Sequence, residues 1–167
     1  MASNASFDVS TGADLQEVDN AVNQALKEIA QRYDFKGTHC TVEFDRAKAE
    51  IRLAADDEFR MDALLDVLQS KLIKRGVPVR NLKIGDLVPS TGQSVRRTVS
   101  ITQGIPQEAA KMIVRAIKDG GFKKVQGSIQ GDEVRVSSPS KDELQAVIAF
   151  LRGRDFGVEL KFGNFRS

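Results

Sequence analysis

Residues 125–136 read Val-Gln-Gly-Ser-Ile-Gln-Gly-Asp-Glu-Val-Arg-Val, and this stretch decides the fold. Apolar and polar residues alternate on both sides of Gly131-Asp132, which is typical of two strands joined by a tight turn. Residues 40–53 repeat the arrangement, with alternation at 40–44 and again at 51–53. The sequence therefore predicts a β-hairpin in each half of the chain.

Each hairpin lies between two stretches of helical periodicity. Apolar residues recur at every third or fourth position in residues 15–33, 61–72, 109–117 and 144–151. Further alternating stretches open and close the two halves, at residues 6–9, 79–84, 95–101 and 158–162. Each half therefore has the element order β-α-β-β-α-β.

This order predicts an α+β protein of two ferredoxin-like (βαββαβ, RNP-like) sandwiches, each a four-stranded antiparallel sheet with helices on one face. We expect a first domain at residues 1–88, a second at 94–167, and a linker at 86–93, where turn-forming residues gather. Halves of about eighty residues are marginal for separate cores. We therefore expect them to support each other by exchanging a strand, with the short strand 6–9 pairing with the other half.

Composition excludes most enzyme classes. The chain has one His and one Cys, too few for a His/Cys zinc site, which needs about four ligands. No phosphate-binding glycine loop and no Gly-x-Ser-x-Gly elbow are present. We expect no enzyme activity, no metal and no cofactor. The N-terminus lacks the features of an export signal and no apolar run could span a bilayer, so we expect a cytoplasmic protein without a membrane partner.

Charge is unevenly distributed along the chain. Residues 1–90 contain 12 Lys or Arg and 15 Asp or Glu, a net charge of −3, whereas residues 91–167 contain 13 and 8, a net charge of +5. Such an asymmetry indicates an anionic partner for the basic half, or else mutual attraction of the halves.

Basic residues of the second half are the candidate phosphate-binding residues. Three of them share the side of a helix opposite its apolar stripe. Strand alternation turns others outward, whereas the corresponding face of the first half, with Asp8, Glu43 and Glu50, is mixed to acidic. The candidates are Lys111, Arg115, Lys118, Lys124, Arg135, Lys161 and Arg166.

The same basic residues also admit two roles that involve no ligand. The helical group can be simply solvated, or the two sheet faces can contact each other, with Lys124 and Arg135 against Glu43 and Glu50. The third strand of each half also lacks the aromatic residues on which RNA-recognition motifs stack bases. We therefore expect phosphate contacts with little sequence readout.

Five segments, in order along nearly the whole chain, carry a resemblance to a known family. They are Ser6-Phe7-Asp8-Val9, residues 71–76, residues 129–136, residues 142–148, and the ending Asn164-Phe165-Arg166. Together they resemble the YajQ family of bacterial nucleotide-binding proteins. The resemblance implies tandem RNP-like domains that bind nucleotides or RNA, in some members cyclic di-GMP, with a link to transcriptional regulators and no catalysis. The alternative is a protein–protein interaction module in which nucleotide binding is incidental.

Overall fold

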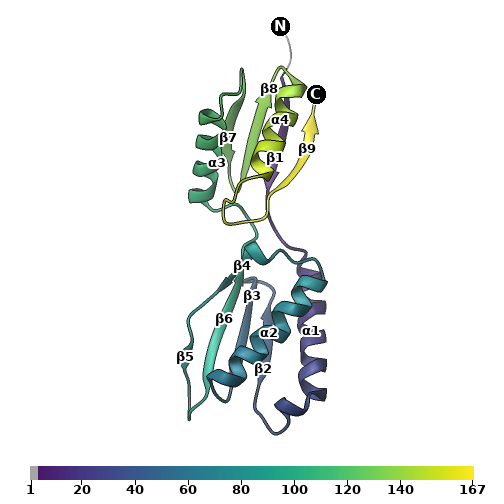
Figure 1. Ribbon diagram of the computed structural model, residues 1–167, viewed down its shortest axis with the longest axis vertical. Coiled ribbons are helices and arrows are strands. Elements are labelled where there is room, and N and C mark those ends of the chain that lie inside the picture. Colours follow the sequence, from purple (N-terminus) through teal and green to yellow (C-terminus); the bar gives the residue numbers. More distant parts are fainter. Residues whose placement is uncertain (1–3) are drawn as a thin grey trace. The chain divides into compact units, whose positions relative to one another are not determined.

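The computed structural model describes residues 4–167 (Figure 1). Residues 1–3, where the expected first domain begins, lie outside the described residues. The chain forms two compact units. Unit 1 combines residues 4–12 with Gln103–Ser167, and unit 2 is Ala13–Thr102.

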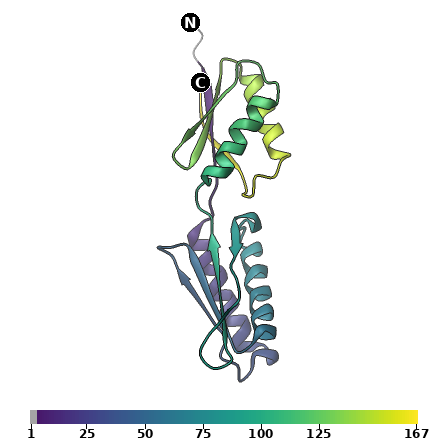
Figure 2. The same cartoon turned by 90° about the vertical axis from the view of Figure 1, so that its left-hand side faces the viewer.

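Unit 1 is a four-stranded antiparallel sheet with two helices on one face (Figures 1 and 2). Its elements are β1 (Ala5–Ser10), α3 (Gln107–Asp119), β7 (Gln126–Gln130), β8 (Glu133–Ser138), α4 (Lys141–Arg152) and β9 (Lys161–Arg166), in the sheet order β7-β8-β1-β9. Alternate residues of the two central strands, Phe7 and Val9 of β1 and Val134 and Val136 of β8, are fully buried against the helices.

Unit 2 repeats this plan with its own core. Its elements are α1 (Leu15–Gln31), the 3₁₀ turn η1 (Tyr33–Phe35), β2 (Thr41–Asp45), β3 (Glu50–Ala55), α2 (Glu58–Lys74), the 3₁₀ turn η2 (Val79–Asn81), β4 (Leu82–Ile84), β5 (Val88–Pro89) and β6 (Val95–Ile101). The sheet order is β2-β3-β6-β4, and the short β5 adds to it by pairing with β6. Ile51, Leu53 and Val99 of the central strands are buried in the core.

Side-chain caps explain where three of the helices begin. Asp14 accepts a hydrogen bond from the Gln16 amide, and Asp57 accepts one from the Arg60 amide. Ser140 accepts from the amide of Glu143, in the Ser-x-x-Glu arrangement of a capping box. Each cap satisfies a backbone N–H that has no partner within its own helix.

Both units have a strand from the other half of the sequence at their centre. β1 lies between β8 and β9, which confirms the predicted two-sandwich fold and the exchange of the first strand. β6 is exchanged in the opposite direction, because it lies between β3 and β4 of unit 2. Each unit therefore buries a central strand that its own half of the sequence does not supply.

This double exchange moves the division of the chain away from the expected linker at 86–93. The chain passes between units at residues 12–13 and 102–103, and part of the expected linker forms β5. The charge asymmetry changes with it. Residues 1–12 and 103–167 contain 11 basic and 9 acidic residues, a net charge of +2, and residues 13–102 contain 14 of each. The net charge of a unit therefore no longer indicates which unit binds an anion. An anion site depends on how individual basic side chains are arranged.

Candidate phosphate-binding surface

Six of the seven predicted residues divide between the two faces of the unit 1 sheet. Three lie on α3, on the face that the helices cover. Arg135 on β8 and Lys161 and Arg166 on β9 lie on the face that the helices leave uncovered, called here the open face. Lys124 is exposed in the turn before β7, with a φ of 55°. The structure therefore places six of these residues in two groups, with Lys124 in neither, and does not form one site from them.

The helical group lies on the exposed side of α3, as its periodicity predicts. Lys111, Arg115 and Lys118 line a shallow hollow of about 380 Å³, together with Ile129 of β7. None of the three forms an ion pair with any residue between 4 and 167. These cations are accessible, but no described contact holds them in one arrangement.

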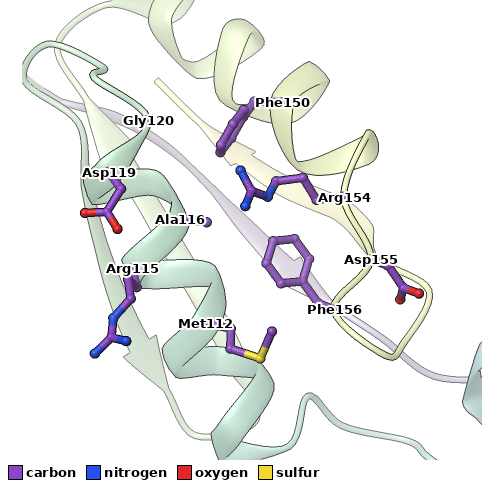
Figure 3. Close-up of a pocket in the computed structure, with 9 residues that line it drawn as sticks. All are labelled: Met112, Arg115, Ala116, Asp119, Gly120, Phe150, Arg154, Asp155 and Phe156. Carbon is purple, nitrogen blue, oxygen red and sulfur yellow. The ribbon is translucent and has the colours of Figure 1, made fainter.

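A cavity of about 530 Å³ lies between α3 and the end of α4 (Figure 3). The Arg154 guanidinium lies over the Phe150 ring, 5.0 Å from its centroid, and Met112 points toward Phe156. Arg115 also lines this cavity, but Figure 3 shows its guanidinium on the side of α3 away from these residues. Asp119 and Asp155 also line the cavity, and Arg115 is the only one of the seven predicted basic residues that borders it.

The open face is polar across all four strands. Because Phe7 and Val9 point into the core, Asp8 between them points to the open face. Directly paired side chains form rows across this face. One row contains Ser128, Arg135 and Asp8, and the next contains Gln126, Ser137, Ser6 and Arg166. A carboxylate thus lies on the central strand of a face that carries basic side chains on both sides.

Asp8 gathers three donors from the strands beside it. Its Oδ1 accepts a hydrogen bond from Arg135 Nε at 3.1 Å, and its Oδ2 accepts from Asn164 Nδ2 at 2.6 Å and from a terminal amine of Arg166 at 2.9 Å. The other terminal amine of Arg166 donates to the Ser6 hydroxyl at 2.9 Å. Two guanidinium groups are therefore held on one carboxylate.

The local environment keeps Asp8 ionised. Burial of the carboxyl raises its pKa, but the hydrogen bonds from Arg135 and Asn164 and the charges of Arg135 and Arg166 together lower the pKa below its usual value. The Asp8 side chain is only 6% exposed, whereas those of Arg135 and Arg166 are 43% and 37% exposed. The negative charge is thus covered, and the positive charges face solvent.

This arrangement leaves donors for an anion. Arg135 uses only Nε toward Asp8, and its terminal amines have no acceptor within residues 4–167. Two arginines on one aspartate leave a local excess of one positive charge. Arginine presents a planar set of N–H groups that matches phosphate oxygens in pairs. The geometry therefore suits a phosphate group. The exposed Lys161 lies on the same edge strand, β9, as Arg166.

The contact of Asp8 with Arg135 changes one of the sequence-based interpretations. Alternation alone groups Asp8 with Glu43 and Glu50 on the face of the first half, but strand exchange places it in unit 1. Arg135 therefore has its carboxylate partner within its own sheet.

Sequence reasoning missed Asp8 and Asn164 as parts of this site. Alternation places Asp8 on the open face, where a carboxylate is ordinarily hydrated, so nothing in the sequence indicated that it would be buried among cationic partners. Asn164 has a φ of 54° at an irregularity in the β1–β9 pairing. That local distortion has no periodic sequence pattern from which it could be predicted.

The described part of the chain offers few residues for acid–base catalysis or metal binding. His39 is 91% exposed, with Nδ1 3.4 Å from the Asp56 carboxylate. No three His, Cys, Asp or Glu side chains among residues 4–167 gather closely enough to hold a metal ion. Within the same residues, no helix combines the length and apolar character that crossing a bilayer requires.

The fold defines a class, α+β proteins of two ferredoxin-like units with exchanged central strands. A family model described as "Nucleotide-binding protein YajQ-like" matches residues 5–166. The chain belongs to this family, as the sequence resemblance indicated.

Full-length relatives support this membership. A protein named "Nucleotide-binding protein" from Carboxydothermus hydrogenoformans is 48% identical over 166 residues, covering 99% of this chain and 100% of the relative. One of the same name from Geotalea uraniireducens is 49% identical over 162 residues, covering 97% and 99%. One from Heliobacterium modesticaldum is 48% identical over 167 residues, covering the whole of both chains.

Proposed function

We propose that this protein is a non-catalytic nucleotide- or RNA-binding protein that holds phosphate groups on the open face of unit 1. The observation that carries the proposal is the pair of guanidinium groups, from Arg135 and Arg166, anchored on the buried Asp8. The names of the full-length relatives agree with it. Lys161 extends the basic character along β9.

Anchoring matters because it reduces the cost of ordering two flexible side chains when a ligand binds. The guanidinium groups come from strands on either side of β1, so two phosphate oxygens or two neighbouring phosphates can be contacted together. Ser128 and Ser137 belong to the same face and can hydrogen-bond to phosphate or sugar oxygens.

The composition of the open face favours phosphate contacts over base recognition. The strand residues that form its rows are Ser, Gln, Arg and Asp, without an aromatic side chain on which a base could stack. Candidate ligands are therefore mononucleotides, cyclic di-GMP and single-stranded RNA, which share accessible phosphates. A transcriptional regulator as a further partner remains a prediction.

The test is calorimetric titration with cyclic di-GMP, GTP, ATP and a short RNA at two salt concentrations. For single-stranded RNA, the slope of log affinity against log salt is about −0.7 per neutralised phosphate. The Arg135→Ala/Arg166→Ala variant is expected to bind at least ten-fold more weakly and to flatten the slope by up to about 1.4. The Lys111→Ala/Arg115→Ala variant is the matched control and should bind like the parent.

If Lys111→Ala/Arg115→Ala weakens binding and Arg135→Ala/Arg166→Ala does not, the phosphate site lies on α3 and not on the open face. Absence of binding to all four ligands would favour the alternative, a protein–protein interaction module. Exposed aromatic side chains of unit 2 give that alternative some basis, because Tyr33 is 89% and Phe59 72% exposed.

A further inference from the structure

The outer side of β7 is an unpaired edge of the unit 1 sheet, with α3 beside it (Figure 1). β7 pairs with β8, and no residue between 4 and 167 forms a backbone hydrogen bond along its other side. Alternate backbone N–H and C=O groups of Gln126–Gln130 therefore point to solvent. An edge of this kind can accept a further strand, which joins the sheet through main-chain hydrogen bonds.

The other described sheet edges carry features that discourage strand addition, namely charged residues, prolines, bulges or short strands. β9 has Lys161 and Arg166 and an irregular register with β1. β2 has Glu43 and Asp45, and the edge made by β4 and β5 consists of two short pieces and includes Pro89. β7 contains neither a charged residue nor a proline, and its register with β8 is regular. Among the described edges, β7 is therefore the one best suited to pairing with another chain.

The hollow of about 380 Å³ that the helical group lines lies between α3 and this edge. Val114 of α3 and Ile129 of β7 give the hollow an apolar part. Gly127 contributes no side chain next to Val114, which remains half-buried. A strand added beside β7 places every second side chain on the α3 side of the sheet. One apolar side chain of such a strand can therefore fill the hollow.

The charge around the hollow is positive. Lys111, Arg115 and Lys118 line it with the single carboxylate of Asp119, and the lysines at 123–124 come just before β7. None of these cations forms an ion pair within the described residues. Successive members of the helical group are separated along the helix axis by about 6 Å and about 4.5 Å. Side chains on one face of a strand are about 6.6 Å apart, so acidic residues at alternate positions of an added strand match this spacing.

We propose that the β7 edge and the helical group bind an extended acidic peptide segment of a partner protein, which joins the unit 1 sheet beside β7. Toward α3, this segment presents carboxylates on either side of one apolar side chain. A second copy of this chain fits less well, because antiparallel pairing of two β7 strands brings two basic α3 helices side by side, and like charges across an interface are costly. The peptide site uses the backbone of β7 and none of the arginines of the open face, so it does not rest on the proposed function.

The experiment is amide NMR of the whole chain, titrated separately with short synthetic peptides. The probe, acetyl-Thr-Glu-Thr-Val-Thr-Glu-Thr-amide, presents Glu, Val and Glu on one side when it is extended. It is expected to shift the amides of residues 126–130 saturably and to slow hydrogen exchange at alternate ones. The same peptide with Gln in place of Glu should bind at least ten-fold more weakly. Replacing the central Val-Thr by Pro-Pro keeps the charge but removes two adjacent N–H groups, one of which must face β7, and should abolish the protection from exchange.

Several outcomes would overturn the proposal. The acidic segment is rejected if the Glu peptide gives no saturable shift, if the Glu and Gln peptides bind equally, or if hydrogen exchange along β7 is unchanged. Protection of β7 that rises with protein concentration in the absence of peptide would show that a second copy occupies the edge. Displacement of the peptide by a short RNA would show that the surface binds nucleic acid.

Variants connect the effect to α3. Lys111→Ala/Lys118→Ala should weaken binding of the Glu peptide at least ten-fold and should leave binding of the Gln peptide unchanged. The matched control, Lys27→Ala/Lys74→Ala, removes two exposed lysines from unit 2 and should bind the Glu peptide like the parent. Thermal melting checks that both variants are folded. An equal loss of affinity in the two variants would mean that net charge alone attracts the peptide, and would contradict the proposed site.

Discussion

The two units share a strand order, yet they arrange opposite charges around the exchanged strand. Register allows a residue-by-residue comparison: Asp8 lies opposite Arg135 in unit 1, and Thr98 lies opposite Arg52 in unit 2. In unit 1 two arginines, Arg135 and Arg166, share one carboxylate. In unit 2 one arginine, Arg52, has two carboxylates within 4.0 Å. The same sheet position therefore leaves excess positive charge in unit 1 and neutralises it in unit 2.

The neighbouring position differs even more. Phe7 pairs with Val136 and is fully buried, while Arg97 pairs with Leu53 at the matching place in unit 2. An apolar anchor in one unit is thus a half-buried cation in the other. The comparison teaches that the same position of a central strand can carry an apolar or a charged side chain while the surrounding fold is kept.

The largest expected effect concerns two fragments of the chain. One is cut at the boundaries of the structural unit, and the other is cut within the linker that the sequence predicts. A fragment of residues 13–102 contains β6 and is expected to fold, whereas residues 1–90 lack the central strand of unit 2 and should remain unfolded. Circular dichroism melting and amide NMR dispersion provide the measurement. Cooperative unfolding of the 1–90 fragment would show that the exchange is not needed for stability.

The matched pair Phe7 and Arg97 tests the difference in packing. Phe7→Ala should lower the free energy of unfolding by about 3–5 kcal/mol, since it empties a buried aromatic site. Arg97→Ala should change it by about 1 kcal/mol or less, because the cation contributes little packing. Denaturant unfolding monitored separately in each unit would measure both. Similar losses for the two variants would remove the proposed distinction.

Asp8 should give unit 1 a specific sensitivity to acid. Its folded pKa is lowered, so its contribution to stability is complete above the ordinary Asp pKa of about 3.9 and is lost as pH falls through the folded pKa. Asp8→Asn should cost about 2 kcal/mol at pH 7, because charge-assisted hydrogen bonds are lost, and should flatten the pH dependence. Melting of unit 1 between pH 7 and pH 2 measures this. Thr98→Val, at the matching position, is the control, and parallel pH profiles for parent and Asp8→Asn would contradict the assignment.

The smallest effect concerns single charges on the two faces. Arg135→Gln should flatten the salt slope of RNA binding by about 0.7, as expected for one phosphate contact. Arg52→Gln should leave the slope unchanged, because Asp45 and Glu50 already neutralise that arginine. Titration at several salt concentrations distinguishes them. Equal slopes in the two variants would mean that carboxylate partners do not decide which arginine is available.

Local periodicity predicted the elements but not all of their partners. The hairpins, the helices and the two-sandwich class follow from alternation and helical spacing, which are read within a few residues. The transfer of β6 to unit 2 could not be read in this way, because alternation reports which side chains face the core and not which sheet the strand joins. Residues 86–93 have the turn composition of a linker, yet Val88 and Pro89 pair with β6.

The candidate site was predictable only one residue at a time. Outward alternation and the basic C-terminus predicted Arg135, Lys161 and Arg166 as candidates. Their relation to Asp8 depends on β1 lying between β8 and β9, a contact between residues near opposite ends of the chain. Helical spacing equally predicted Lys111 on the exposed side of α3, and sequence offered no means to separate the two groups.

The position of β1 also has a consequence for synthesis on the ribosome. β1 is made before its partner β9, which ends at Arg166, so one edge of the strand stays unpaired until β9 has been made. At about 5–20 residues per second, that wait lasts roughly 8–30 seconds. Unit 2 can close once Thr102 has emerged, and we predict that it folds first. Proteolysis of stalled nascent chains would reveal the order, and early protection of β1 would contradict it.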